Sequence, residues 1–252
     1  MPAIALALAI TSVLAACTAS APALTDPKAI ISQGMKATSQ ATSFHVDVQV
    51  TGTVNLQDTG GTFNLTGTTA AGDFDLPNKL AHLTFSAPGL MGLTGDVIQI
   101  GNDSYVKTSL TGTTYTKSTT SAAEGVKTDP DALFTQVTSF LDKEGVETAK
   151  LDDVDCGDAK CYAVTLTVPT SQLGVPGTTD GVDVRQFLAD GLKLNLQFDR
   201  STLRLTSAST DIDAGTLGTF GLSLTVSKYN ESVQVSPPPS DQVTTGGNPL
   251  GL

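Results

Sequence analysis

The chain has 252 residues and carries 14 Lys and Arg against 25 Asp and Glu, a formal net charge of −11 at pH 7. This balance argues against a nucleic-acid partner, because binding a polyphosphate needs clustered cations. Only 15% of the residues are charged, and the chain has no Trp and two His, so the side chains that usually carry catalysis are scarce. We therefore expect neither an enzyme nor a cofactor.

An apolar run extends from Ala3 to Ala16. Its last three residues and the next one form the string Leu14-Ala15-Ala16-Cys17. A membrane-spanning helix needs about 20 apolar residues, so the run is too short to cross and is typical of a signal peptide over residues 1–16. The Leu-Ala-Ala-Cys string resembles a bacterial lipobox, which implies that Cys17 is acylated and that residues 17–24 form a tether. An ordinary secretion signal that happens to contain a cysteine is the alternative.

Cys156 and Cys161 remain as a pair in an exported, oxidising setting. They lie at the apex of a hairpin that we expect from Lys150 to Val168. A metal site would need two more soft ligands nearby, and a redox site favours Cys-x-x-Cys spacing. We expect a structural disulfide and no metal site.

Two helices begin with the same signal, an Asp that can cap the helix followed by Pro at its first position. Asp26-Pro27 opens a helix predicted to run to Gln40, and Asp129-Pro130 opens a second. A weaker third helix is predicted from Val182 to Asp190. The apolar stripe of the second helix comprises Leu133, Phe134, Val137, Phe140 and Leu141.

The rest of the chain alternates apolar and polar residues in short runs with Gly-, Asn- and Asp-rich turns between them, which predicts some ten antiparallel strands. The sequence Ser236-Pro237-Pro238-Pro239 stops a strand, and the Gly- and Thr-rich remainder is poor in apolar residues. We expect one folded domain over residues 25–235 and a flexible tail over 236–252. The expected strands are Phe44–Thr51, Thr62–Ala70, Lys79–Phe85, Asp96–Ile100, Ser104–Thr108, Thr113–Ser118, Cys161–Val168, Leu192–Asp199, Leu203–Asp211 and Phe220–Tyr229.

These elements predict an α+β fold, a large curved antiparallel sheet with two or three helices. Ten strands accumulate enough twist to curl the sheet. Two or three helices of about 12 residues are too few to cover so broad a face. The sheet therefore either folds into a sandwich or curls around the helices and leaves an apolar hollow.

The order of these features resembles the LppX/LprAFG lipoproteins of actinobacteria. The resemblance rests on the lipobox, the two Asp-Pro helices, the segment Gly89–Gly95 leading into a strand pair, and the late hairpin Phe198–Leu205. It implies a LolA-like half-barrel wrapped over helices and enclosing a hydrophobic cavity. It also implies a cargo of acylated lipids or glycolipids, carried across the cell envelope.

Apolar residues on the inward phase of the strands and on the second helix are the candidate lining of such a cavity. The alternative is that they pack on one another as a dry core. The candidates are Phe44, Val46, Val48, Phe63, Leu65, Phe74, Leu83, Phe85, Val97, Ile100, Leu133, Phe134, Val137, Phe140 and Leu141.

Two further features have a functional and a plain interpretation. Leu90, Met91 and Leu93 lie among three glycines, either as an apolar flap at a cavity mouth or as an ordinary hairpin connection. His45 and His82 fall on the polar phase of their strands, so we expect surface histidines rather than bases or ligands.

We expect a monomeric lipid-binding lipoprotein on the extracytoplasmic face of the cell membrane, held there by acylated Cys17, with an export transporter as a candidate partner. The rival hypothesis is a surface interaction or sensory lipoprotein with a closed core and a protein partner. A filled core without a pocket would favour the rival.

Overall fold

The computed structural model describes residues 23–56, 61–118, 135, 137–173, 188 and 191–245. The predicted signal peptide, Cys17, Leu133, Phe134 and nearly all of the third predicted helix lie outside these residues. Thr135 and residues 137–140 are helical, where the second helix is predicted to end.

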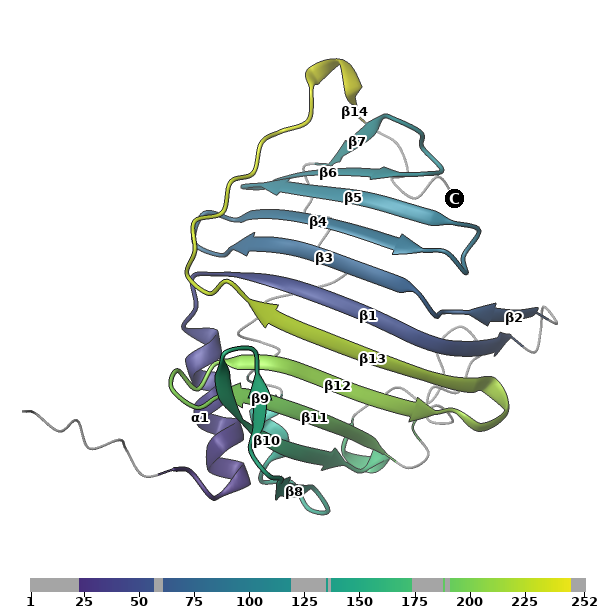
Figure 1. The fold of residues 1–252 in the computed structure, drawn as a ribbon. Coiled ribbons are helices and arrows are strands. Elements are labelled where there is room, and N and C mark those ends of the chain that lie inside the picture. Colours follow the sequence, from purple (N-terminus) through teal and green to yellow (C-terminus); the bar gives the residue numbers. More distant parts are fainter. Residues whose placement is uncertain are drawn as a thin grey trace, which may run out of the picture.

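One continuous sheet dominates the fold (Figure 1). Its strand order is β14-β7-β6-β5-β4-β3-β1-β13-β12-β11-β10-β8, with β2 paired to β1 and β9 paired to β10. The strands are β1 Ser43–Leu56, β2 Gly61–Asn64, β3 Thr68–Asp75, β4 Leu80–Ala87, β5 Leu93–Ile100, β6 Asp103–Thr108, β7 Tyr115–Ser118, β8 Glu147–Lys150, β9 Val154–Cys156, β10 Ala159–Val168, β11 Leu192–Asp199, β12 Leu205–Asp213, β13 Gly218–Ser227 and β14 Val243–Thr245. Short 3₁₀ turns lie at Thr170–Gln172, Gly215–Leu217 and Ser240–Gln242.

Among the residues that the structure describes, the sheet has fourteen strands instead of the ten predicted, and it is mixed because β14 pairs parallel to β7. The predicted strand Thr62–Ala70 is wrong as one element. It divides into β2 and β3 at Gly67, whose φ of +88° forms a turn that glycine adopts without strain. The predictions of strands at Leu192–Asp199 and Phe220–Tyr229 are confirmed as β11 and β13, with a small shift of the latter.

The helix α1, Pro27–Ser39, is confirmed with its cap. Asp26 accepts the backbone N–H of Lys28 at 3.2 Å, and Pro27 occupies the first turn, where its missing N–H leaves no bond unmade. Within the described residues α1 is the one complete α-helix, so the structure does not place two or three helices over the sheet.

The main core lies at one end of the sheet, where α1 packs on β10, β11 and β12. Gly34 allows this close approach, because a Cβ atom there would overlap the ring of Phe198. Thr38 Oγ1 donates to the carbonyl of Gly34 at 2.8 Å and accepts the backbone N–H of Leu205 at 2.9 Å, which joins α1 to β12. The fully buried members are Ile30, Ile31, Val164, Leu166, Val168 and Phe198.

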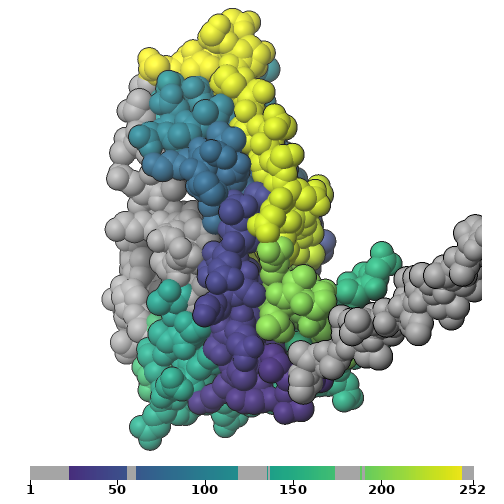
Figure 2. Space-filling view, turned by 90° about the vertical axis from the view of Figure 1, so that its left-hand side faces the viewer, coloured from purple at the N-terminus to yellow at the C-terminus, as the bar shows by residue number. Residues whose placement is uncertain are grey.

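A second, smaller cluster lies at the other end of the sheet and on its opposite face. Ile98, Tyr105 and Tyr115 form it, and Val235 and Val243 from the C-terminal segment pack against it. Figure 2 shows this segment in yellow, running along the ends of the strands to the top of the molecule. The described part of the expected flexible tail, residues 236–245, therefore differs from the expectation and ends in a paired strand.

Candidate functional site

The cross-strand register assigns every strand residue to one of two faces, because paired residues share a face and neighbours along a strand alternate. Phe44 and Val46 pack against the α1 core. The face to which they belong is called the helix face here. Val48 and Val50 follow on the same phase of β1, and their partners Leu224 and Leu222 continue that face onto β13.

Beyond the α1 core, the helix face carries a set of apolar residues that are only half-buried, whereas Ala87 and Val106 on the same face are buried. Leu222 lies on β13, near the middle of the sheet, and is 42% exposed. Its six apolar neighbours on this face are intermediate in burial. The set is called the apolar patch and consists of Val48, Val50, Phe74, Leu83, Phe85, Val97 and Leu222.

Small residues alternate with large ones across the apolar patch. Phe85 on β4 pairs with Gly95 on β5, and a Cβ on Gly95 would overlap the Phe85 ring. Gly72 on β3 pairs with Leu83, and a Cβ there would lie 2.9 Å from Leu83 Cδ1. The large side chains can thus lie close to the sheet, which lowers the height of the patch.

The structure separates the predicted lining residues into groups. Phe44, Val46, Val137 and Phe140 pack against the α1 core, and Leu141 is buried within it. Phe63 pairs with Val54 at the far end of β1, and Leu65 lies in the turn before β3. The placement of Ile100 in the lining is wrong, because it belongs to the opposite face and packs against Ile98 and Tyr105. Val48, Phe74, Leu83, Phe85 and Val97 come together in the apolar patch.

Both histidines lie on the opposite face. His45 Nδ1 is 2.7 Å from Asp73 Oδ1, and His82 Nε2 is 3.0 Å from Asp96 Oδ1. His82 is exposed and His45 is half-buried, so the expectation of surface histidines holds best for His82.

Lys107 and Tyr115 continue this row of polar side chains on the opposite face. The Tyr115 hydroxyl donates to Asp96 at 2.8 Å, and Lys107 Nζ donates to the Tyr115 oxygen at 3.0 Å. The bond to Tyr115 raises the pKa of Lys107 despite partial burial, and Asp96 adds to the effect. The opposite face thus carries a row of paired polar and charged side chains beside its own apolar cluster.

Two surface hollows lie on the opposite face, with volumes of about 440 and 640 Å³. The smaller one is lined by polar side chains, among them Thr84, Asp96 and Lys107, and also by Ala71 and Phe85. The larger one lies beside the disulfide and is lined by Gln197, Arg204, Thr206 and Tyr229. Phe85 of the apolar patch contributes to the lining of the smaller hollow, and no member of the patch lines the larger one.

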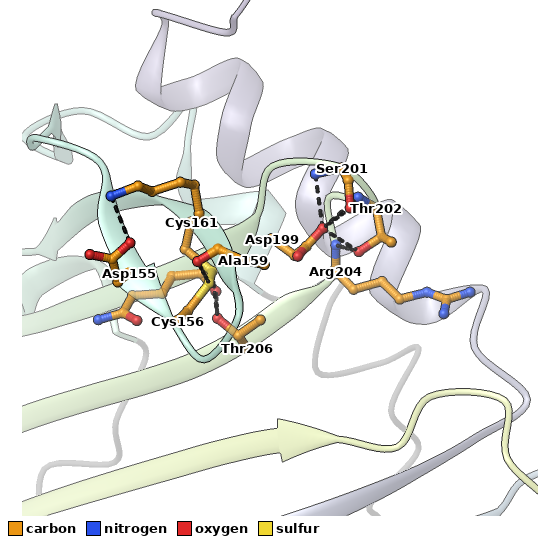
Figure 3. Close-up of a disulfide and its surroundings, with 11 residues drawn as sticks. Asp155, Cys156, Ala159, Cys161, Asp199, Ser201, Thr202, Arg204 and Thr206 are labelled. Atoms are coloured by element: carbon orange, nitrogen blue, oxygen red, sulfur yellow. Dashed lines mark hydrogen bonds and ion pairs between the residues drawn. A yellow bond between two sulfur atoms is a disulfide. The ribbon is translucent and has the colours of Figure 1, made fainter.

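The expected disulfide between Cys156 and Cys161 is confirmed, with a Cα–Cα distance of 5.9 Å (Figure 3). It closes the hairpin of β9 and β10 across the turn at Gly157. Lys160 Nζ lies 2.6 Å from Asp155 Oδ1 beside it, so this acidic hairpin carries its own counter-charge.

Asp199 forms a compact turn next to the disulfide (Figure 3). Its Oδ1 accepts the backbone N–H groups of Ser201 and Thr202 at 2.8 and 2.7 Å, and both hydroxyls at 2.5 and 3.0 Å. Burial raises the pKa of Asp199, but these hydrogen bonds together outweigh burial and leave it below the ordinary value of 3.8. The turn orients the start of β12, where α1 binds.

Leu90, Met91 and Leu93 lie where β4 turns into β5. The turn is closed by backbone bonds, from Leu90 N to Ala87 O and from Gly92 N to Pro88 O. Met91 is 95% exposed and Leu90 is exposed beside it. The hairpin connection is therefore present, and it displays two apolar side chains at its tip.

Sequence reasoning missed Leu222, although its signal was available. Phe220, Leu222, Leu224 and Val226 alternate with Gly, Ser and Thr along β13, the pattern of a strand with one apolar face. Only the register with Val50 places Leu222 in the apolar patch.

Among the residues that the structure describes, no helix is long and apolar enough to cross a membrane. In the same part of the chain, no three His, Cys, Asp or Glu side chains gather in a way that could hold a metal ion.

No protein-family model and no curated protein sequence matches the chain. Solved structures do. The chain is similar to the lipoprotein LppX of Mycobacterium tuberculosis, with a TM-score of 0.55 and 21% identity over 83% of this chain and 97% of LppX. It is also similar to LprF of Mycobacterium bovis, with a TM-score of 0.54 and 15% identity over 84% of this chain and 96% of LprF. The chain therefore has the fold of the LppX and LprF lipoproteins.

Proposed function

We propose that the protein binds acylated lipids or glycolipids on the apolar patch and carries them across the cell envelope. The observation that carries the proposal is the exposure of Leu222 in the middle of the apolar face. A dry core would bury this residue, because protein interiors pack as densely as organic crystals. At the α1 end of the same face, Val164, Leu166 and Phe198 are buried in this way.

The energetics of carriage fit a site without catalytic groups. Moving an acyl chain through water costs about 0.8 kcal/mol per methylene, so a chain of 16 carbons faces on the order of 12 kcal/mol. An apolar surface that covers the chain removes most of this penalty. The protein would act passively, by shielding the chains of its cargo.

The proposal includes the cellular location of the protein. Acylated Cys17 would hold the domain on the extracytoplasmic face of the cell membrane, and the disulfide suits that oxidising side. The likeness to LppX, a lipoprotein, supports this arrangement. The net charge of −11 makes electrostatic binding to anionic headgroups unfavourable, so attachment would depend on the covalent lipid.

The test uses the full chain with Cys17→Ser, which removes the acylation site. After purification it is extracted with organic solvent and the extract is examined by mass spectrometry. We expect co-purified acyl lipid, and uptake of labelled lipid from vesicles by the stripped protein. Absence of both would overturn the proposal and favour a lipoprotein with a closed core and a protein partner.

A further inference from the structure

Charged side chains are distributed unevenly between the two ends of the strands. At the end on the right-hand side of Figure 1, the described residues of the turns and strand ends from β7 to β13 include no Asp, Glu, Lys, Arg or His. The opposite ends of the same strands carry Asp75, Lys79, Asp103 and Lys228. The end without charges is called the charge-free rim and consists of residues 50–55, 61–69, 86–95, 108–114 and 214–222.

The charge-free rim has a boundary on each side. Asp213 on β12 pairs with Thr219 and borders it on one side. Asp241 precedes β14, which pairs with β7 from Tyr115 onwards, and borders it on the other side. Asp58, between β1 and β2, lies outside the described residues. Because the rim itself carries no charge, the whole net charge of −11 belongs to other parts of the chain.

The charge-free rim contains most of the exposed apolar side chains. In the described part of the chain five large apolar residues are exposed, and four of them, Leu90, Met91, Leu110 and Leu222, lie in the rim. Leu90 and Met91 are in the β4–β5 turn, and Leu110 is in the β6–β7 turn. Leu222 also belongs to the apolar patch, so the rim and the patch are continuous. Exposed apolar side chains gathered in one region mark an interaction surface.

The turns of the charge-free rim make hydrogen bonds within the protein. In the β6–β7 turn, Thr111 N donates to Thr108 O at 3.0 Å. Ser109 N donates to Thr94 O at 2.9 Å, which joins this turn to the start of β5. A backbone group that already has a partner in the protein does not need water, so these turns can leave water at a lower cost.

The residue types of the charge-free rim favour a lipid bilayer over a protein partner. The centres of protein interfaces are enriched in Tyr, Trp and Arg, and the five segments of the rim contain none of these three. An anionic bilayer repels an acidic protein, so the edge without charges meets it with the least repulsion. Contact through this edge also avoids moving a charged side chain from water toward hydrocarbon.

We propose that the charge-free rim is the edge with which the protein contacts a lipid bilayer when it loads or releases its cargo. Leu90, Met91 and Leu110 enter the headgroup region, and acyl chains pass from the bilayer over Leu222 onto the apolar patch. This inference rests on the proposed function. It adds a docking surface and an orientation on the bilayer, which the apolar patch alone does not define.

The chain has no Trp, so a single introduced Trp reports only its own surroundings. Met91→Trp, Leu110→Trp and Leu151→Trp are each made in the full chain with Cys17→Ser, stripped of lipid and mixed with dioleoyl phosphatidylcholine vesicles. Leu151 is the matched control, because it is 48% exposed against 55% for Leu110 but lies outside the rim. We expect the fluorescence of the two rim variants to shift to shorter wavelength and to be quenched by lipids brominated on their acyl chains. The fluorescence of Leu151→Trp should stay unchanged.

Leu110→Glu tests the need for an uncharged rim. Binding to the same vesicles, measured by flotation, should weaken about tenfold or more, because the transfer of one large apolar side chain is lost and a charge is brought to the bilayer. Leu151→Glu is the control and should bind like the parent chain. Circular dichroism of both variants should match that of the parent, since both side chains are exposed.

The outcomes separate this inference from the proposed function. A fluorescence shift that persists after the loaded protein is separated from the vesicles would place cargo instead of a bilayer against the rim, and would overturn the inference. So would a shift that grows with protein concentration without vesicles, which would assign the rim to a second copy of the chain. Unchanged fluorescence in both rim variants, while they still take up labelled lipid, would overturn the inference and leave the proposed function intact. Absence of both uptake and co-purified lipid would instead overturn the proposed function.

Discussion

Gly34 of α1 lies directly against the ring of Phe198 on β11, so closely that a Cβ atom on Gly34 would be 2.5 Å from Phe198 Cε1. Phe198 is fully buried and cannot turn away. This pair sets the distance between the helix and the sheet, and it therefore positions the end of the helix face at which the apolar patch begins.

Gly34→Ala is expected to destabilise the protein by about 1–2 kcal/mol. Overpacking a core costs about 1–3 kcal/mol, and the gain in helix propensity from Gly to Ala offsets up to about 1 kcal/mol. Urea denaturation followed by circular dichroism measures the effect. Gln33→Ala, on the exposed side of the same helix, is the control and should be neutral. Equal stability of the two variants would show that α1 can move away from Phe198.

The sequence predicted those elements whose signal is local. Asp26-Pro27 and the apolar stripe of α1 were sufficient for the helix, and strict alternation was sufficient for β11 and β13. The Cys156–Cys161 bond followed from spacing and compartment.

The sequence does not predict an element whose formation depends on a residue far away in the chain. The three-residue strand β14 exists because β7 lies beside it, a pairing that no local pattern shows. Ile100 is a different kind of error. It lies three residues from Val97, so strand alternation puts the two side chains on opposite faces, and the pattern alone could have excluded one of them from the lining.

Breaking the disulfide should weaken the fold modestly. The loop between Cys156 and Cys161 is short, so the loop-closure model gives about 2 kcal/mol. The double variant Cys156→Ser, Cys161→Ser is compared with the oxidised protein by thermal denaturation, and a fall in Tm of several degrees is expected. Lipid content should not change, because the hairpin is remote from the apolar patch. A loss of bound lipid at a temperature where the variant is folded would contradict that separation.

Acid should weaken the turn at Asp199. Because the folded pKa lies below the ordinary value of 3.8, the charged carboxylate stabilises the protein above that value, and this contribution is lost as the pH falls through the folded pKa. Asp199→Asn should lower the free energy of unfolding at pH 7 by about 1 kcal/mol after allowance for solvent screening. The difference from wild type should shrink below pH 3.8. Asp158→Asn, at an exposed position in the neighbouring hairpin turn, is the control, and a difference independent of pH would refute the role of the charge.

Leu222→Gln tests the apolar patch itself. Because the side chain is 42% exposed, the change should alter the free energy of unfolding by less than about 1 kcal/mol. A polar group in the path of an acyl chain should nevertheless lower the lipid recovered by extraction several-fold. Leu151→Gln is the matched control, since Leu151 is 48% exposed but lies next to β8, away from the patch. Equal lipid content in the two variants would exclude the apolar patch as the lipid-binding surface.

Variants at the tip of the β4–β5 hairpin distinguish an apolar flap from a plain hairpin connection. Met91 and Leu90 are exposed, so replacing both with Ser should leave stability unchanged. If the tip contacts a membrane surface during loading, the double variant loses the transfer of two apolar side chains, each worth up to about 1.5–3 kcal/mol when fully buried. Uptake of labelled lipid from vesicles should then slow about tenfold or more, while the amount bound at equilibrium stays the same. Leu151→Ser should show wild-type kinetics. An unchanged rate in the double variant would make the tip a hairpin connection and nothing more, because an apolar group that never enters the membrane cannot speed the exchange of lipid with it.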